Sequence, residues 1–285
     1  MNEAKNYPGI YENLIINVAL TGAIPMKSDY SSLPIEPSEI AEDVARCFEA
    51  GARVFHIHMR DGDGKQTHDQ KLYEETIGLI RKTCPEAIVC TTTTSRGGAT
   101  LEERKTSLLL QGNLKPEFAS LSLGSFNFRD SVSLNPPIEI SELLSTMNEH
   151  SVRPELEVFE PGMVCYAKNL IENHLLVGTP VFNMFLGLPT TSDASLLSAS
   201  SFLGQLPYGS EWAFAGIGRH QLPVAAMSIS AGGNVRVGME DSPSIFGDKD
   251  WPNLKAVSWA ADFAKTIKRD LATPEEARER LGIKQ

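Results

Sequence analysis

The sequence lacks the features that mark exported, disulfide-stabilised or membrane-spanning proteins. It has four cysteines, Cys47, Cys84, Cys90 and Cys165, and no two of them form a CxxC pair. Because disulfide frameworks and cysteine-based zinc sites need clustered spacings, reduced thiols are expected. No apolar run reaches the roughly 18 residues of a membrane helix, and the opening MNEAKNYPGIYENLIINVAL lacks the basic start and long apolar core of a signal peptide. These absences predict a cytoplasmic protein with no membrane partner.

An excess of positive charge is missing as well. The formal net charge is −10 and the isoelectric point is near 5.2, with no basic cluster to offset the acidic surface. Nucleic acid and anionic membranes are therefore not expected partners, whereas a small-molecule substrate is. With 285 residues, 41% of them hydrophobic and 22% charged, the chain is long enough for two modest domains or one large α/β barrel.

What the sequence does contain is a regular alternation of strand-like and helix-like segments. The helical pattern is clear after Pro37, where Ile40, Val44 and Cys47 recur on one face and Gly51 follows the last turn. Similar helical segments are expected at 69–83, 101–110, 139–149, 162–173, 193–204, 221–231 and 253–268. Between the helices lie eight strand-like runs, at 14–20, 54–59, 87–94, 118–124, 155–160, 181–187, 212–218 and 234–241.

This order predicts a TIM (β/α)8 barrel formed by a single domain over residues 1–285. The closing stretch TPEEARERLGIKQ is expected to add a short capped C-terminal helix to the barrel. A doubly wound open sheet is the alternative fold, but no GxGxxG motif follows the first strand. The barrel is therefore the predicted fold, and active sites in such barrels lie at the carboxyl ends of the strands.

Two of the six histidines, His56 and His58, are one residue apart in the second strand-like run, within FHIHMR. Side chains at i and i+2 of a strand share one face, so both imidazoles can point into the mouth of the barrel. Neutral imidazole is a common metal ligand, and the pair therefore predicts a metal site. The alternative is that each histidine is a hydrogen-bonded core residue.

The eighth strand-like run ends in NVRVGMED, which places Arg236, Glu240 and Asp241 at its terminus. A carboxylate there would face the same mouth as His56 and His58. Two histidines and Glu240 would make a three-ligand site with an open position, the pattern of catalytic zinc. Asp241 is then free to act as a base, while Arg236 orients it or holds a substrate carboxylate. Taken alone, Glu-Asp-Ser-Pro is also an ordinary surface turn.

These residues lie in motifs that resemble the β-keto acid cleavage enzyme family, whose members include 3-keto-5-aminohexanoate cleavage enzymes. The resemblance covers nearly the whole chain and rests on NVALTGA, LPIEPSEIAEDVARCFEAGARVFHIHMRD, KPEFASLSLGSFNF, RPELEVFEPGM and AGIGRHQLPVAAMSISAGGNVRVGMED. It implies a TIM barrel that assembles as a homodimer or homotetramer. It also implies zinc (Zn²⁺) held by His56, His58 and Glu240, with Asp241 as the base and Arg236 supporting it. The implied reaction converts a β-keto acid and acetyl-CoA into acetoacetate and a new acyl-CoA.

The threonine-rich end of the third strand-like run, TTTTSRGG, is a candidate for substrate binding. It offers hydroxyl groups at Thr94 and Ser95 and backbone N–H groups at Gly97 and Gly98. Such donors suit a carboxylate or an enolate oxygen. The alternative is that a threonine run is ordinary strand material.

Polar or glycine-rich ends of other strands are further candidates. Ser122 and Glu157 lie near the ends of the fourth and fifth strand-like runs, where a substrate pocket is expected, although a buried glutamate can also be a paired structural acid. Gly216, Gly218 and Arg219 precede the seventh helix, where barrel loops commonly bind phosphate. The phosphates of CoA are the expected ligand there, and the alternative role of the glycines is tight packing.

One position departs from the family pattern. In members that act on an amino-bearing keto acid, an acidic residue follows TGA and meets the ammonium group, whereas this chain has Ile24 and Pro25. An uncharged or differently charged β-keto acid is therefore expected.

Two other functions remain as alternatives. One is another metal-dependent TIM-barrel enzyme, either a class II-type aldolase or lyase or an amidohydrolase-like hydrolase. The other is a non-catalytic metal or ligand binder. The positions of His150, His174 and His220 in expected helices or loops count against an amidohydrolase.

Overall fold

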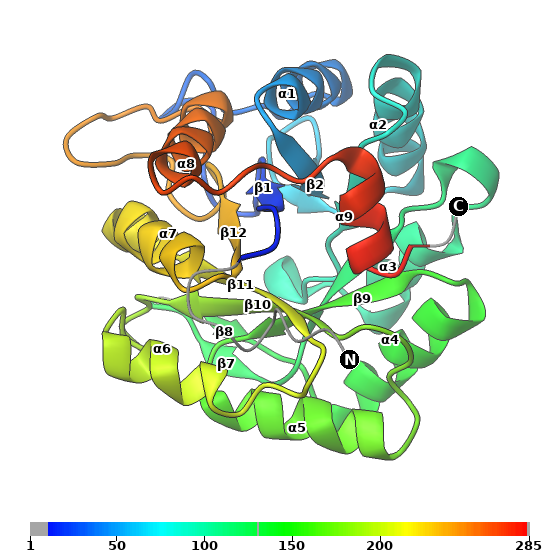
Figure 1. Cartoon of the computed structure of the whole chain (residues 1–285). Coiled ribbons are helices and arrows are strands. Elements are labelled where there is room, and N and C mark those ends of the chain that lie inside the picture. The colour runs from blue at the N-terminus through cyan, green and yellow to red at the C-terminus, as the bar shows by residue number, and fades with distance from the viewer. Residues whose placement is uncertain (1–10, 130, 284–285) are drawn as a thin grey trace.

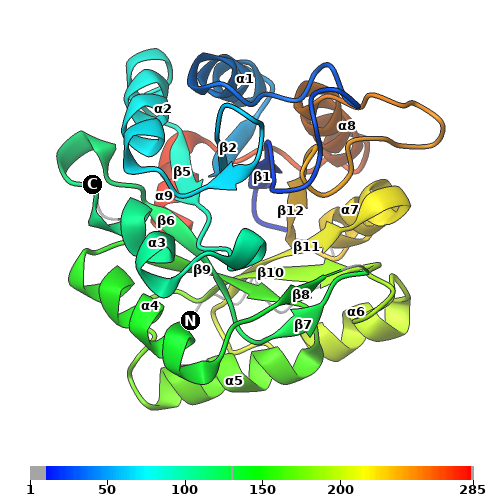
Figure 2. The ribbon, with the colours of Figure 1, turned by 180° about the vertical axis from the view of Figure 1, so that it is seen from behind.

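The computed structural model describes residues 11–129 and 131–283, and its central feature is a closed barrel of parallel strands. In their order around the barrel the strands are β1 (Ile16–Ala19), β12 (Asn234–Val237), β11 (Glu211–Gly216), β10 (Val181–Leu186), β9 (Arg153–Val158), β6 (Phe118–Ser122), β5 (Ile88–Thr91) and β2 (Ala52–Ile57). Strand β1 pairs with both β12 and β2, which closes the ring. Helices surround the strands on the outside (Figures 1 and 2). The predicted TIM barrel is confirmed.

The helices fall in the segments that the hydrophobic periodicity predicts. They are α1 (Pro37–Glu49), α2 (Gln70–Thr83), α3 (Leu101–Lys105), α4 (Pro137–Glu149), α5 (Pro161–Glu172), α6 (Leu196–Leu203), α7 (Gln221–Ser230), α8 (Asn253–Thr266) and α9 (Pro274–Arg280). In α1, Pro37 occupies the first turn, Glu39 accepts the Glu36 N–H, and Ile40 and Val44 are buried. Across the described ranges, no helix combines the length and apolar character needed to cross a membrane.

At the carboxyl end of the barrel, here called the mouth, the strands stop earlier than the apolar runs predict. Strand β2 ends at Ile57, so His58 lies just beyond it. Strand β12 ends at Val237, so Glu240 and Asp241 lie in the turn that follows. The parallel ladders to the neighbouring strands end at these points, and the chain leaves the barrel there. The predicted site residues therefore lie on strand ends and on the first residues of the loops.

Two short hairpins lie at the mouth, and the hydrophobic pattern predicts neither. One joins β3 (Met59–Arg60) to β4 (Gln66–Thr67), and the other joins β7 (Phe126–Asn127) to β8 (Val132–Ser133). Figure 2 shows the β7–β8 hairpin in front of the strands. Strands this short leave no periodic signal in a sequence. The helix predicted at 101–110 is also shorter, because α3 gives way to a 3-10 turn at Thr106–Leu109.

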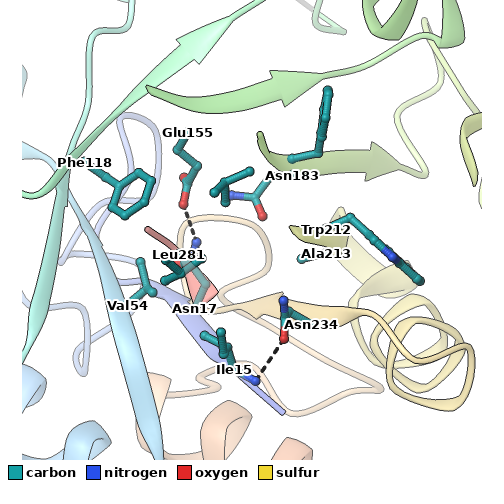
Figure 3. Close-up of a pocket in the computed structure, with 12 residues that line it drawn as sticks. Ile15, Asn17, Val54, Phe118, Glu155, Asn183, Trp212, Ala213, Asn234 and Leu281 are labelled. Carbon is teal, nitrogen blue, oxygen red and sulfur yellow. Dashed lines mark hydrogen bonds between the residues drawn. The ribbon is translucent and has the colours of Figure 1, made fainter. Parts of the chain in front are cut away.

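The opposite, amino-terminal end of the barrel, here called the floor, is covered by α9 (Figure 1). The Thr273 hydroxyl accepts the Glu276 N–H and caps this helix, as the sequence predicts. Ala277 and Leu281 pack with Ile15 and other apolar residues at the amino ends of the strands. Above Leu281 lies a cavity of about 20 Å³, shown in Figure 3.

The apolar core lies between the outer faces of the strands and the helices. The inside of the barrel is consequently free to hold polar side chains. Asn17 and Glu155 line the floor cavity, and His56 and Arg236 line a second cavity at the mouth. None of these four side chains is more than 6% exposed. Buried polar groups are costly unless they are paired or bind a ligand, so they locate the candidate site.

Candidate active site

The predicted metal ligands His56, His58 and Glu240 meet at the mouth. The Nε2 atoms of the two histidines are 3.0 Å apart. The Glu240 carboxylate has one oxygen 3.6 Å from His56 Nε2 and the other 3.4 Å from His58 Nε2. Ligand atoms of the three residues all lie within 4.8 Å of one another. One ion could therefore contact all three side chains, which are called the metal-ligand cluster below.

Hydrogen bonding decides which nitrogen of His58 faces the cluster. His58 Nδ1 lies 2.7 Å from Oε1 of Gln66 on β4, and an amide oxygen only accepts hydrogen bonds. The His58 proton is therefore on Nδ1, and the lone pair of Nε2 is directed at Glu240. His56 Nδ1 has no hydrogen-bond partner in the described part of the chain and lies 3.9 Å from Glu155 Oε1. Both imidazoles thus present Nε2 to the cluster.

The turn that carries Glu240 depends on close backbone packing. Gly238 has a φ of +143°, and a Cβ at this position would lie 2.2 Å from Ala19 O, so only glycine fits. On the other side, a Cβ at Gly22 would lie 2.6 Å from Glu240 Cγ. The Glu240 N–H donates to Ala19 O at 3.2 Å. Glycines after β1 and β12 therefore let the two strand ends bring Glu240 against His56.

Arg236 on β12 binds the carboxylates around the cluster. Its Nε and Nη2 donate to the two oxygens of Asp241 at 2.9 and 3.2 Å. Nη2 also donates to Glu240 at 3.0 Å, and Nη1 donates to Glu157 at 3.3 Å. The other Glu157 oxygen accepts a hydrogen bond from the Ser122 hydroxyl at 2.9 Å. These contacts orient Asp241 and leave no edge of the Arg236 guanidinium free for a substrate carboxylate.

Burial and neighbouring charges set the protonation states of the cluster. Burial lowers the pKa of His56 well below its ordinary value, so this imidazole is neutral at pH 7. Burial opposes ionisation of Glu240, but its neighbours, among them the permanently charged Arg236, outweigh burial and hold the pKa of that carboxyl well below its usual range. For Asp241, burial and the nearby Glu240 prevail over Arg236 and raise the pKa. Asp241 is consequently a stronger base than an exposed aspartate.

This donor set fits a divalent metal such as zinc. Two histidines with one carboxylate are the ligand set of many catalytic zinc sites. Glu240 Oε2 is buried without a hydrogen-bond partner among the described residues, and it faces the histidine nitrogens. His56 also lies near Cys90 and Glu155 in a second possible group. That group fits less well, because burial raises the pKa of the Cys90 thiol well above its ordinary value and metals bind the thiolate.

The cluster opens into a cavity of about 220 Å³ at the mouth. Three of the predicted substrate contacts line it, namely Thr94, Ser122 and Glu157. Asp241 lines the same cavity, and Ile24 forms part of its wall. The candidate base, the metal-ligand cluster and several hydroxyl donors therefore face one space.

The other predicted substrate contacts lie outside this cavity. The Ser95 hydroxyl accepts the Leu134 N–H at 3.1 Å, so it is already engaged with the loop beside it. Gly97 and Gly98 are exposed and have φ angles of +77° and +79°. Neither glycine is among the residues that line the cavity. A role for these residues in substrate binding stays a prediction.

The cavity wall also contains residues that motif reasoning missed. They are four aromatic side chains and one cation: Phe126, Phe128, Phe159, Phe185 and Arg96. Aromatic residues near strand ends are typical of the core, so the sequence gives no reason to assign them to a pocket. The one sequence signal for Arg96 is that it is the single charged residue in TTTTSRGG, the segment in which β5 ends.

The glycines before the seventh helix have packing roles. A Cβ at Gly216 would lie 2.4 Å from His220 O, so the backbone approach there needs glycine. The Gly218 N–H donates to Asp241 O at 2.8 Å and is therefore not available to a phosphate. Arg219 is exposed, with Nε 3.3 Å from His220 Nε2. Phosphate binding at these positions stays a prediction, and Arg219 is the residue with free donors.

Comparison with known proteins identifies relatives of nearly the whole chain. Residues 13–283 match the family described as beta-keto acid cleavage enzyme. The 3-keto-5-aminohexanoate cleavage enzyme of Fusobacterium nucleatum is 35% identical over 278 residues, covering 96% of this chain and 99% of that protein. The 3-oxoadipate:acetyl-CoA acetyltransferase of Cupriavidus necator is 33% identical over 273 residues, covering 94% of each chain.

Among solved structures, the apo form of ObcA superimposes with a TM-score of 0.77 at 22% sequence identity. The match covers 88% of this chain and 65% of ObcA, so this chain spans just under two thirds of that protein's length. At this level of identity the likeness shows a shared barrel fold and nothing about ligands.

Proposed function

The chain belongs to the beta-keto acid cleavage enzyme family, and we propose that it uses zinc to convert a β-keto acid and acetyl-CoA into acetoacetate and a new acyl-CoA. The observation that carries this proposal is the convergence of His56, His58 and Glu240 within reach of one ion. Asp241, held by Arg236, faces the same cavity. The names of the relatives support the choice of substrates, because they pair keto acids with cleavage or with acetyl-CoA.

In this proposal His56 Nε2, His58 Nε2 and the Glu240 carboxylate hold one zinc ion. When bound, the metal supplies Lewis-acid stabilisation of negative charge on the keto oxygen of the substrate. The hydrogen bond between His58 and Gln66 keeps the Nε2 lone pair directed at the ion position. The ionised Glu240 balances part of the metal charge.

Asp241 acts as the base and takes a proton from the carbon between the keto and carboxylate groups. Its raised pKa favours that transfer, and Arg236 holds both of its oxygens in place. The carbanion attacks the thioester carbonyl of acetyl-CoA and expels the CoA thiolate. The thiolate then attacks the original keto carbon, the carbon–carbon bond beside it breaks, and the released acetoacetate carbanion takes back the proton.

Other side chains of the mouth bind the two substrates. Thr94 and Ser122 lie on the cavity wall and offer hydroxyl donors to the keto acid carboxylate. The exposed Arg219 offers its guanidinium to a CoA phosphate. Assembly as a homodimer or homotetramer is part of the same proposal, and the oligomeric mass in solution would test it.

The direct test is to incubate the purified, zinc-loaded protein with acetyl-CoA and a panel of β-keto acids. We expect acetoacetate and one new acyl-CoA in equal amounts, both measured by mass spectrometry. Asp241→Asn serves as the matched control, because it leaves the proposed metal ligands unchanged. Cleavage of a keto acid without acetyl-CoA would instead favour a metal-dependent aldolase or lyase. The absence of acetoacetate with every keto acid would rule out the proposed reaction.

A further inference from the structure

Arg96 is a cation in the mouth cavity that forms no ion pair with any described residue. It begins the 3-10 turn η2 (Arg96–Gly98) after β5 and lines the cavity together with the metal-ligand cluster. Its guanidinium carbon lies 3.3 Å from the centroid of the Phe128 ring. Its Nε is buried, and within residues 11–129 and 131–283 it has neither a hydrogen bond nor an ion pair. Arg96 as a whole is partly buried, and a partly buried cation with an unpaired N–H is costly until an anion binds it.

The carboxylates of the cavity are already committed elsewhere. Glu157, Glu240 and Asp241 each accept a hydrogen bond from Arg236. The remaining wall near the end of β1 is apolar, with Ile24 on the cavity side. The negative charges of Glu240 and Glu157 reach Arg96 from a distance, but no described carboxylate of the cavity wall forms an ion pair with it, so a ligand carboxylate is the available direct partner.

A series of aromatic rings on the cavity wall runs from Arg96 to Arg236. Phe128 meets Phe159 edge-on with 6.4 Å between ring centroids, and Phe159 stacks on Phe185 at 4.4 Å. Arg236 lies over the far side of this series, 4.9 Å from the Phe185 centroid. The two guanidinium groups therefore mark opposite ends of an apolar surface. Such a surface suits the methylene groups of an extended substrate.

We propose that Arg96 binds a second carboxylate at the far end of the substrate, so that the preferred keto acid is dicarboxylic. The planar guanidinium, held by stacking on Phe128, presents paired N–H donors that match the two oxygens of a carboxylate. The reacting end of the substrate lies at the metal-ligand cluster and Asp241, and the alkyl chain follows the aromatic wall. This inference rests on the proposed function for the position of the reacting end.

The test compares two keto acids of equal length, 3-oxoadipate and the monocarboxylic 3-oxohexanoate, in wild type, Arg96→Met and Arg96→Lys. We expect wild type to favour 3-oxoadipate by roughly tenfold to a hundredfold in kcat/KM, the range for a charge-assisted contact. Arg96→Met should lose that preference, mainly through a higher KM for 3-oxoadipate, with 3-oxohexanoate changed by less than about twofold. Arg96→Lys, which keeps the positive charge, should retain part of the preference for 3-oxoadipate. Arg46→Met, on the outside of α1, is the matched control and should behave as wild type.

Binding of unreactive acids separates this inference from the proposed function. By calorimetry without acetyl-CoA, adipate should bind wild type more tightly than hexanoate, and Arg96→Met should remove the difference while keeping its zinc content. That result would support Arg96 as a carboxylate site even if no keto acid were turned over. Equal losses on both keto acids in Arg96→Met, or an unchanged preference, would overturn the inference while leaving the proposed reaction intact.

Discussion

The two ends of the barrel use the same strands but treat their buried polar groups in opposite ways. At the floor, the Asn234 side chain accepts the Ile15 N–H at 3.0 Å and donates to Glu211 at 2.9 Å. Arg280 of α9 also binds Glu211, which ties the covering helix to the strand ends. These groups are satisfied by the protein itself, so they hold the barrel closed.

At the mouth, polar atoms are left without protein partners. Glu240 Oε2 and Arg96 Nε are buried and lack hydrogen bonds within the described residues. The cavity beside them measures about 220 Å³, enough for a small organic acid. Unpaired groups next to such a space are expected where a ligand completes the bonding. The mouth therefore combines unpaired polar atoms with a space large enough for a substrate, and that combination marks it as the functional end.

The floor has unpaired atoms too, but their setting is different. Asn17 Oδ1 and Asn183 Nδ2 lack partners, and both residues line the floor cavity of about 20 Å³ (Figure 3). A space of that size accommodates about one water molecule. Asn17 also donates to Glu155 at 2.7 Å. Glu155 Oε1 also lacks a hydrogen bond among the described residues, but a space for one water molecule cannot hold a substrate, and this is the difference between the two ends.

The largest expected effect is loss of the metal from the mouth. His56→Ala and Glu240→Ala should each lose bound zinc and lower turnover by roughly a thousandfold or more, because Lewis-acid stabilisation is worth several kcal/mol. Elemental analysis after desalting measures the metal directly. Asn234→Ala at the floor is the control and should keep a full complement. Full zinc content in both mouth variants would place the metal elsewhere.

The second prediction concerns the base at the mouth. Asp241→Asn removes the proposed proton acceptor but none of the proposed ligands, so zinc content should stay at the wild-type level. Turnover should fall by roughly 10² to 10⁴, the range for general acid-base catalysis. Loss of metal together with activity would make Asp241 a structural support of the cluster, and unchanged turnover would remove it from the mechanism.

The third prediction concerns the floor. Asn234→Ala leaves the buried Ile15 N–H without its acceptor and removes one of the two hydrogen bonds to Glu211 Oε2, the other coming from Arg280. The free energy of unfolding should therefore fall by about 1 to 3 kcal/mol. Asn148→Ala removes a single exposed hydrogen bond and should lower the free energy of unfolding far less. Urea denaturation measures both. The kcat of Asn234→Ala should match wild type, and a clear drop would mean that the two ends are coupled.

The sequence predicts the barrel and the metal-ligand cluster because both depend on periodic or paired signals. Strand runs recur with helices between them, and a His-x-His spacing puts His56 and His58 on one side wherever the strand ends. Glu240 could be assigned to the same metal site, because the carboxyl ends of all strands meet at one rim of a barrel. The carboxyl ends of the strands near His58 and Glu240 were less predictable. The apolar runs in the sequence continue beyond the last residues that pair with a neighbouring strand.

The rest of the site could not be predicted, because it depends on where loops return. Gln66 orients His58 from a two-residue strand, and Phe128 follows another, neither of which leaves a hydrophobic pattern. The role of Arg96 becomes visible only in the structure, where Phe128 lies against it and no described carboxylate pairs with it. For Gly97 and Gly98 the sequence suggested a role that the cavity does not reflect. Glycines can offer backbone N–H donors, but these two residues are not among those that line the cavity.

The smallest expected effect tests the rim of the mouth at Ile24. This side chain is 64% exposed, on a loop that Arg60 holds through hydrogen bonds to Gly22 O and Pro25 O. An ammonium group brought against Ile24 would lose hydration without gaining a counter-charge. Wild type should therefore disfavour 5-amino-3-oxohexanoate relative to 3-oxohexanoate by about tenfold in kcat/KM, a cost of about 1.4 kcal/mol.

Ile24→Glu should remove this preference, because it supplies the missing carboxylate on a loop whose anchors are untouched. Ile24→Gln, similar in size but uncharged, is the control and should leave the preference close to that of wild type. A competition assay with both keto acids measures the ratio directly. If wild type already prefers the amine, then a carboxylate of the Arg236 network, with Glu157 as the first candidate, must leave its partner to meet the ammonium group. In that case the mouth would be able to rearrange its ion pairs around a substrate.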